Sequence, residues 1–173
     1  MKAFVATIAV VLTALALGLA ARRGSPAAAE RKSPAGVHVY ATWETMEFDK
    51  CVAAWLILKF LDEEARFVFH AQGSEIEEGV AFDVPRAAWS RKHRKCASDC
   101  LMEEIRTEDA AAARIVEIAH QIELNAWHLD DFPEAKRRLG DFREISERNG
   151  EASACLKEAL AYIDDLYAAY KKG

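Results

Sequence analysis

The alternation of apolar and polar residues predicts a small β-sheet in the first half of the chain. Residues 37–42 alternate and are rich in β-branched and aromatic side chains, which predicts a strand, and residues 66–70 and 80–84 give two more strands. Between the first two strands, residues 49–61 predict a helix that is apolar nearly all round, with Asp49 as its N-cap. A helix of this kind is buried, so we expect it to pack against the sheet.

Helical periodicity dominates the second half of the chain. A short helix is predicted over residues 97–105, and Thr107 caps a longer one whose core-facing stripe is Ala111, Ile115, Ile118 and Ile122. Pro133 starts a further helix, which ends before Asn149 and Gly150, and residues 151–171 form the last one. The pattern predicts one α+β domain over residues 37–173, with an N-terminal β-α-β-β sheet followed by a helical half.

The start of the chain has the order of a secretory signal. An apolar run over residues 3–21 follows a lysine, and Arg22, Arg23 and the small residues of 24–29 come next. We expect a signal peptide and a periplasmic or secreted protein. The alternative is an uncleaved inner-membrane anchor with the domain facing the periplasm, because the run is nearly long enough to cross a bilayer. Residues 30–36 then read as a polar linker.

The charge balance argues against nucleic acid as a partner. Removing residues 1–29 removes three of the 23 basic residues and none of the 28 acidic ones, which leaves a net charge of −8. A nucleic-acid binder needs a broad basic face. We therefore expect the inner membrane as a partner only if the leader is uncleaved, and no nucleic acid.

One basic stretch stands out against this acidic background. Arg91, Lys92, His93, Arg94 and Lys95 directly precede Cys96, and Cys100 follows one helical turn later. Nearby cations favour the thiolate form of a cysteine and also attract small anions. The stretch predicts a reactive thiol or an oxyanion site. The alternative is a solvated turn followed by cysteines that serve as small core residues.

The four cysteines also allow disulfides in an oxidising compartment. Cys51, Cys96, Cys100 and Cys155 permit three complete pairings, among which the sequence does not choose. Cys96 and Cys100 are one helical turn apart, a spacing suited to shared metal binding and awkward for a disulfide.

Two clusters have metal-ligand chemistry. His93, Cys96 and Cys100 combine an imidazole with two thiols, which suits zinc or a soft copper-type ion, although the spacing is not that of a zinc finger. On the long helix, His120 and Glu123 share a face, but a solvated acid and a packed histidine explain the same pattern. The sequence contains no glycine-rich phosphate loop and no hydrolase motif, so a conventional enzyme is not favoured.

Several segments, taken in order, resemble a known family. The chain reads Asp-Lys over 49–50 and Trp-Leu-Ile-Leu-Lys-Phe-Leu-Asp over 55–62, then Phe-Asp-Val-Pro over 82–85, and Asp-Asp-Leu-Tyr over 164–167. It resembles the chromate-resistance exported protein family, whose domain also forms the C-terminal part of the ChrB regulator. The positions that match are Asp49, Trp55, Asp83, Ser90, Cys96 and His120, with Glu123 an approximate match and Asp99 where an acid follows the family cysteine.

The chain departs from the family pattern at three places. Ala53 stands where a cysteine is expected, and Arg91 where a histidine is expected. The family's His-Asp-x-Asp has become the segment from His120 to Glu123, which keeps the imidazole and one acid. If these positions hold a metal or a redox thiol in the family, the site has been partly lost or rebuilt in this chain. The resemblance implies a role in keeping chromate from accumulating.

The leading hypothesis is an exported chromate-resistance protein that binds an oxyanion or a metal ion and is not a conventional enzyme. Its oxyanion, chromate, would meet the side chains Arg91, Lys92, Arg94 and Lys95, together with Asp49 and Ser90. Its metal, a transition metal ion if there is one, would take ligands from Cys96, His93, Cys100, His120 and Glu123. The alternatives are a metal-dependent envelope enzyme using His120 and Glu123, and a noncatalytic envelope domain with a degenerate site.

Overall fold

The computed structural model describes residues 38–172 and builds them around a small parallel sheet. Its three strands are β1 (Val39–Trp43), β2 (Arg66–His70) and β3 (Val80–Ala81), in the order β2-β1-β3. β1 lies in the centre, paired with β2 from Val39–Arg66 to Trp43–His70, and with β3 at Tyr40 and Ala41. The carboxyl ends of the parallel strands therefore lie at the same edge of the sheet, and the buried charged residues Lys50 and Asp83 lie near that edge.

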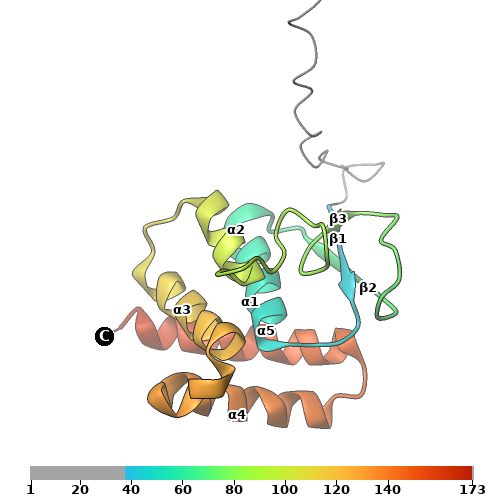
Figure 1. The fold of residues 1–173 in the computed structure, drawn as a ribbon. Helices are drawn as coiled ribbons and strands as arrows, with labels where there is room; N and C mark the ends of the chain where they lie inside the picture. The colour runs from blue at the N-terminus through green and yellow to red at the C-terminus, as the bar shows by residue number, and fades with distance from the viewer. Residues whose placement is uncertain (1–37, 173) are drawn as a thin grey trace, which may run out of the picture.

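Helices form the larger part of the domain and lie to one side of the sheet (Figure 1). They are α1 (Phe48–Leu56), continued by a π-helical turn (Ile57–Leu61), α2 (Ala97–Ile105), α3 (Ala110–Leu124), a 3-10 segment (Ala126–Asp131), α4 (Pro133–Arg148) and α5 (Ala152–Tyr170). All nine residues of α1 are buried, and α1 contacts α2, α3 and α5. The expected single α+β domain with a buried first helix is confirmed.

Aromatic side chains anchor α1 to α5. The Trp55 ring lies 5.2 Å from the Tyr167 ring and edge-on to Phe60, and its indole N–H donates to Asp164 at 2.9 Å. Tyr167 in turn donates its hydroxyl to Asp109 at the start of α3. These contacts hold the helices around α1 in fixed positions, which matters because the candidate site lies between α2 and α3.

The third strand is shorter than the pattern of residues 80–84 predicted. β3 ends at Ala81, Phe82 makes an isolated bridge with Trp89, and Asp83 has a left-handed backbone with φ 48°. The alternation of apolar and polar residues continues past Ala81, where the backbone turns out of the sheet. The hydrophobic pattern alone therefore overestimated the length of the strand.

Two predicted helix caps are wrong. The N-cap of α1 is Glu47, and Asp49 lies inside the first turn, where its carboxylate serves another helix instead. The N-cap of α3 is Asp109, which accepts from the backbone N–H groups of the second and third helical residues at 3.0 Å. Thr107 accepts from the N–H of Asp109, so it supports the cap from outside the helix.

The predicted signal peptide or anchor (residues 1–29) and the linker (residues 30–36) lie outside the described residues. Within residues 38–172, no helix is both long enough and apolar enough to cross a membrane.

Candidate functional site

The site begins at the N-terminus of α2, where Cys96 occupies the N-cap position. The Asp99 carboxylate reaches back to the backbone N–H of Cys96 at 2.9 Å, which is the acidic half of a capping box. A cysteine replaces the usual serine or threonine at the N-cap. This local motif fixes the Cys96 thiol and the Asp99 carboxylate beside each other.

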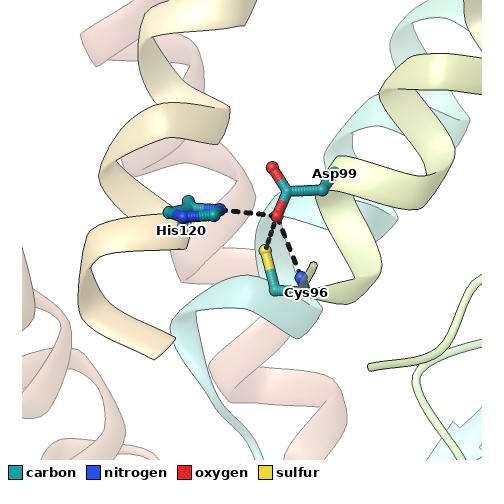
Figure 2. Close-up of side chains that lie close together, drawn as sticks. All are labelled: Cys96, Asp99 and His120. Atoms are coloured by element: carbon teal, nitrogen blue, oxygen red, sulfur yellow. Dashed lines mark hydrogen bonds and ion pairs between the residues drawn. The ribbon is translucent and has the colours of Figure 1, made fainter. Parts of the chain in front are cut away.

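A histidine from α3 completes the group (Figure 2). His120 Nδ1 lies 2.8 Å from Asp99 Oδ2, and Cys96 Sγ donates to the same oxygen at 3.2 Å. One sulfur, one oxygen and one nitrogen atom from these residues all lie within 4.8 Å of one another, and no other group of three or more such residues does so in the described part of the chain. We call these three residues the Cys96–Asp99–His120 cluster.

The cluster is buried at its sulfur and open at its other two members. Cys96 is 1% exposed, whereas the side chains of Asp99 and His120 are 19% and 29% exposed. Burial, followed by the negative charge of Asp49, raises the pKa of the Cys96 thiol far above its usual range. Cys96 is therefore a protonated thiol in the metal-free protein, and only a strong competitor for its proton, such as a metal cation, would convert it to a thiolate.

Asp49, on α1, holds the N-terminus of α2 next to the cluster. Its two carboxylate oxygens accept from the backbone N–H groups of Ala97 and Ser98, at 2.8 and 3.1 Å, and the residue is only 3% exposed. The free N–H groups of a helix N-terminus favour a negative charge. A carboxylate from α1 thus caps α2, and it sets the position of Cys96 from another part of the chain.

A buried lysine follows Asp49 in α1. Lys50 is 3% exposed, donates to the carbonyl oxygens of Trp43 and Thr45, and lies 3.7 Å from Asp83 Oδ2. Burial, and next the charge of Asp49, raise the pKa of Asp83 to about 7, while Lys50 opposes the shift. A buried ion pair between Lys50 and Asp83 therefore lies at the carboxyl end of β1.

Glu123 lies one turn along α3 from His120 but faces a different partner. Arg91 donates to the Glu123 backbone carbonyl at 2.8 Å and lies 3.4 Å from its carboxylate. Burial, then the negative charges of Asp49 and Glu47, raise the pKa of Glu123 to about 7. Glu123 is outside the Cys96–Asp99–His120 cluster.

The structure therefore brings together two of the five predicted metal ligands, Cys96 and His120. His93 is exposed in the turn before α2, and Cys100 is buried with its thiol 3.5 Å from the Ser90 carbonyl oxygen. Both lie outside the cluster, as Glu123 does. All four cysteines of the chain are free and buried, so the structure contains none of the three disulfide pairings.

The basic residues predicted to meet an oxyanion lie in or beside a tight turn before α2, and Ser90, predicted with them, donates its hydroxyl to the Ala87 carbonyl oxygen at 2.9 Å. Lys92 and Lys95 exchange backbone hydrogen bonds at 2.9 and 3.4 Å, and Lys95 pairs with Glu103. Arg91, Lys92 and Arg94 are exposed. Lys92 and Lys95 lower the pKa of Cys100, but burial outweighs them and the pKa is raised overall.

Two residues that matter here were not singled out as site residues by their sequence. Asp99 was noted as the acid that follows the family cysteine, and its role in the site is recognisable when Cys96-x-x-Asp99 is taken as a capping box with cysteine in the serine position. Lys50 belongs to the Asp-Lys segment that carries the family resemblance, but its burial gives no signal in the sequence, because a lysine in the first turn of a helix is ordinarily solvated. Its burial follows from the position of α1 at the carboxyl end of β1.

The family model described as "ChrB, C-terminal domain" matches residues 40–170. The chain belongs to this family. The match spans the sheet, the Cys96–Asp99–His120 cluster and all five helices, and it confirms the resemblance drawn from the sequence motifs.

Membership of the ChrB C-terminal domain family associates the chain with chromate resistance. No similar curated protein and no similar solved structure was found.

Proposed function

We propose that this ChrB C-terminal domain acts in chromate resistance by binding a transition-metal cation at Cys96, Asp99 and His120. The observation that carries the proposal is the convergence of one thiol, one carboxylate and one imidazole from two helices within 4.8 Å. Thiolate and imidazole ligands suit zinc, copper and related ions rather than magnesium or calcium. Three protein ligands with solvent on one side leave a coordination position open.

The surrounding charges support a cation in preference to free chromate. Asp49, Asp83 and Glu123 are all partly or fully buried near the cluster. Burial, and next the charge of Asp49, raise the pKa values of Asp83 and Glu123. The nearby cations are already engaged, Lys50 with Asp83 and Arg91 with Glu123. A free dianion would meet net negative charge here, whereas a bound metal cation would be stabilised by it and would still offer an open position to an oxyanion.

Export is part of the proposal and has separate support. The first 29 residues follow the order of a secretory signal, and the four cysteines are buried, a state compatible with an oxidising compartment. We infer that the domain works in the periplasm or outside the cell. Fractionation of cells expressing the full chain checks this independently of metal binding.

The test of the metal site uses two matched cysteine variants. Cys96→Ser keeps an oxygen that caps helices well and removes the soft ligand, so its fold should survive. Cys100→Ser makes the same atomic change one helical turn away, outside the cluster. Each protein is stripped with a chelator and titrated with Co²⁺, whose thiolate charge-transfer absorption reports sulfur coordination, and bound metal is counted by elemental analysis.

We expect one equivalent of Co²⁺ with a thiolate band in the parent protein and in Cys100→Ser, and at least a tenfold weaker association without the band in Cys96→Ser. His120→Asn should weaken binding as well, since an amide can still bond to Asp99 but is a poor metal ligand. Equal binding by the parent and Cys96→Ser would show that the cluster is only a helix cap. Saturable binding of chromate to the metal-free protein would contradict the choice of a cation.

A further inference from the structure

A cavity that shares no residue with the cluster is lined in part by Glu123. It has a volume of about 270 Å³ and is formed by the segment entering α1, the C-terminal part of α3 and one face of α4. Its lining residues are Met46, Glu47, Phe48, Ile122, Glu123, Leu139, Phe142, Arg143, Ser146 and Glu147. The volume lies just below the range of about 300–1,000 Å³ that is common for ligand pockets, which limits an occupant to a small molecule.

The floor of this cavity is apolar and firmly packed. Phe48 and Phe142 are each at most 5% exposed and meet edge to face with their ring centroids 5.9 Å apart. Ile122 is buried beside them, and Leu139 is partly buried against the same core. Such a floor favours a ligand with an aromatic or branched aliphatic body.

The polar part of the lining is strongly acidic. Glu47, Glu123 and Glu147 supply three carboxyl groups against the single guanidinium of Arg143. The Glu123 side chain is only 16% exposed, and Arg91 lies 3.4 Å from its carboxylate. Burial with the charges of Asp49 and Glu47 outweighs Arg91 and raises the pKa of Glu123 to about 7. A cation in the cavity would reverse this penalty by pairing with the ionised form.

Separation of the carboxyl groups argues against a bare metal ion as the occupant. Glu47, Glu123 and Glu147 do not offer three oxygens within 4.8 Å of one another, in contrast to the Cys96–Asp99–His120 cluster. An ammonium group needs only one or two carboxylates, and the remaining volume above the phenylalanine floor is left for an apolar body.

We propose that this cavity binds a small organic cation, a primary amine carried on an aromatic or branched aliphatic group, with the ammonium at Glu123 and the apolar body over Phe48 and Phe142. The proposal goes beyond metal binding and does not depend on it, since the residues of the cavity and of the cluster are different. Glu123, which matches a family position only approximately, then serves this second site.

The test compares three probes that differ in charge and share an aromatic body. Phenethylamine, 2-phenylethanol and 3-phenylpropionate are titrated into the full domain by calorimetry at pH 8, where the amine is cationic. We expect saturable amine binding at least tenfold tighter than binding of the alcohol, and no detectable binding of the carboxylate. Equal binding of amine and alcohol, or no saturable amine binding at millimolar concentration, would overturn the proposal.

Matched variants locate the bound ammonium. Glu123→Gln should weaken amine binding about tenfold and leave the alcohol unchanged, because it removes one charge and keeps the side-chain shape. Glu108→Gln removes an equal charge from an exposed residue just before the N-terminus of α3, at the other end of the helix from Glu123. It should leave the affinity for the amine unchanged. Glu147→Gln removes an exposed carboxylate of the cavity lining without disturbing the interior, and should weaken amine binding less than Glu123→Gln does.

Two further outcomes separate this site from the metal centre. Cys96→Ser should bind the amine as the parent does, and a loss of amine binding there would contradict the independence of the two sites. Equal amine affinity in Glu123→Gln and Glu108→Gln would show that the amine does not bind at the cavity, whatever the result of the cobalt titration.

Discussion

The cross-helix cap made by Asp49 gives the sharpest stability prediction. Asp49→Asn keeps the size of the side chain but replaces one of two accepting oxygens by an amide NH₂, which then faces a backbone N–H. One hydrogen bond to the α2 N-terminus is lost, at 2.8 or 3.1 Å in the parent, together with the charge that favours that helix end. Hydrogen bonds to charged groups contribute about 1.5–3 kcal/mol, so we expect a loss of about 3 kcal/mol in unfolding free energy.

The same substitution also relieves repulsion, and this gives the prediction a pH dependence. Burial, and next the charge of Asp49, raise the pKa values of Asp83 and Glu123, each to about 7. At pH 6 these neighbours are mostly protonated and Asp49 repels little, whereas at pH 8 they are mostly ionised. The loss caused by Asp49→Asn should therefore be smaller at pH 8 than at pH 6, by roughly 1 kcal/mol.

Urea denaturation followed by tryptophan fluorescence and circular dichroism at both pH values measures these losses. Asp165→Asn is the matched control, since it makes the same change at an exposed position of α5 and should shift the unfolding free energy by less than about 0.5 kcal/mol. A loss below about 0.5 kcal/mol for Asp49→Asn at pH 6 would refute the cap. A loss that grows with pH would refute the charge reasoning.

Three further predictions concern single groups. The pKa of Asp83 is about 7 in the folded protein and 3.8 ordinarily, so between these pH values the folded state holds a proton that the unfolded state has lost. This group therefore makes the free energy of unfolding fall as the pH rises from about 4 to 7. Asp83→Asn should flatten that fall in urea titrations at pH 5–8, and an unchanged slope would contradict the raised pKa. Burial raises the Cys96 pKa, so a thiol reagent at pH 8 should label Cys96 only slowly until denaturant is added; fast labelling of the native protein would contradict its burial. Tyr167→Phe removes a hydroxyl that donates to Asp109 at 2.7 Å and should cost about 1–2 kcal/mol by urea denaturation, an expectation that unchanged stability would disprove.

Much of the architecture was predictable because it depends on local pattern. The strand at residues 66–70 and the helix at residues 97–105 have the bounds that periodicity predicted. Pro133 starts α4 and Asn149 ends it, since a proline at the first helical position and a polar turn after the last one act through their own backbone. The family was also accessible, because its motifs are short stretches of sequence.

The candidate site was only half predictable. Cys96 was singled out for the basic residues before it, but none of these is among the main influences on its thiol, whose pKa burial and Asp49 raise instead. His120 was singled out by its place on α3, yet its partner is Asp99 from α2 and not Glu123 from its own helix. Spacing along one helix identifies shared faces, and it does not show which side chain another helix brings opposite.

The sequence by itself therefore determined the set of elements and the α+β class, which follow from interactions between near neighbours in the chain. It also determined the family, whose motifs are short stretches of sequence. Only the tertiary structure decided what the polar residues do. It turned Asp49 from an expected cap of its own helix into the cap of α2, and placed Asp99 between Cys96 and His120. It also buried Lys50 against Asp83. The physical reason is that burial and charge depend on residues distant in sequence, which meet only when the helices pack around α1.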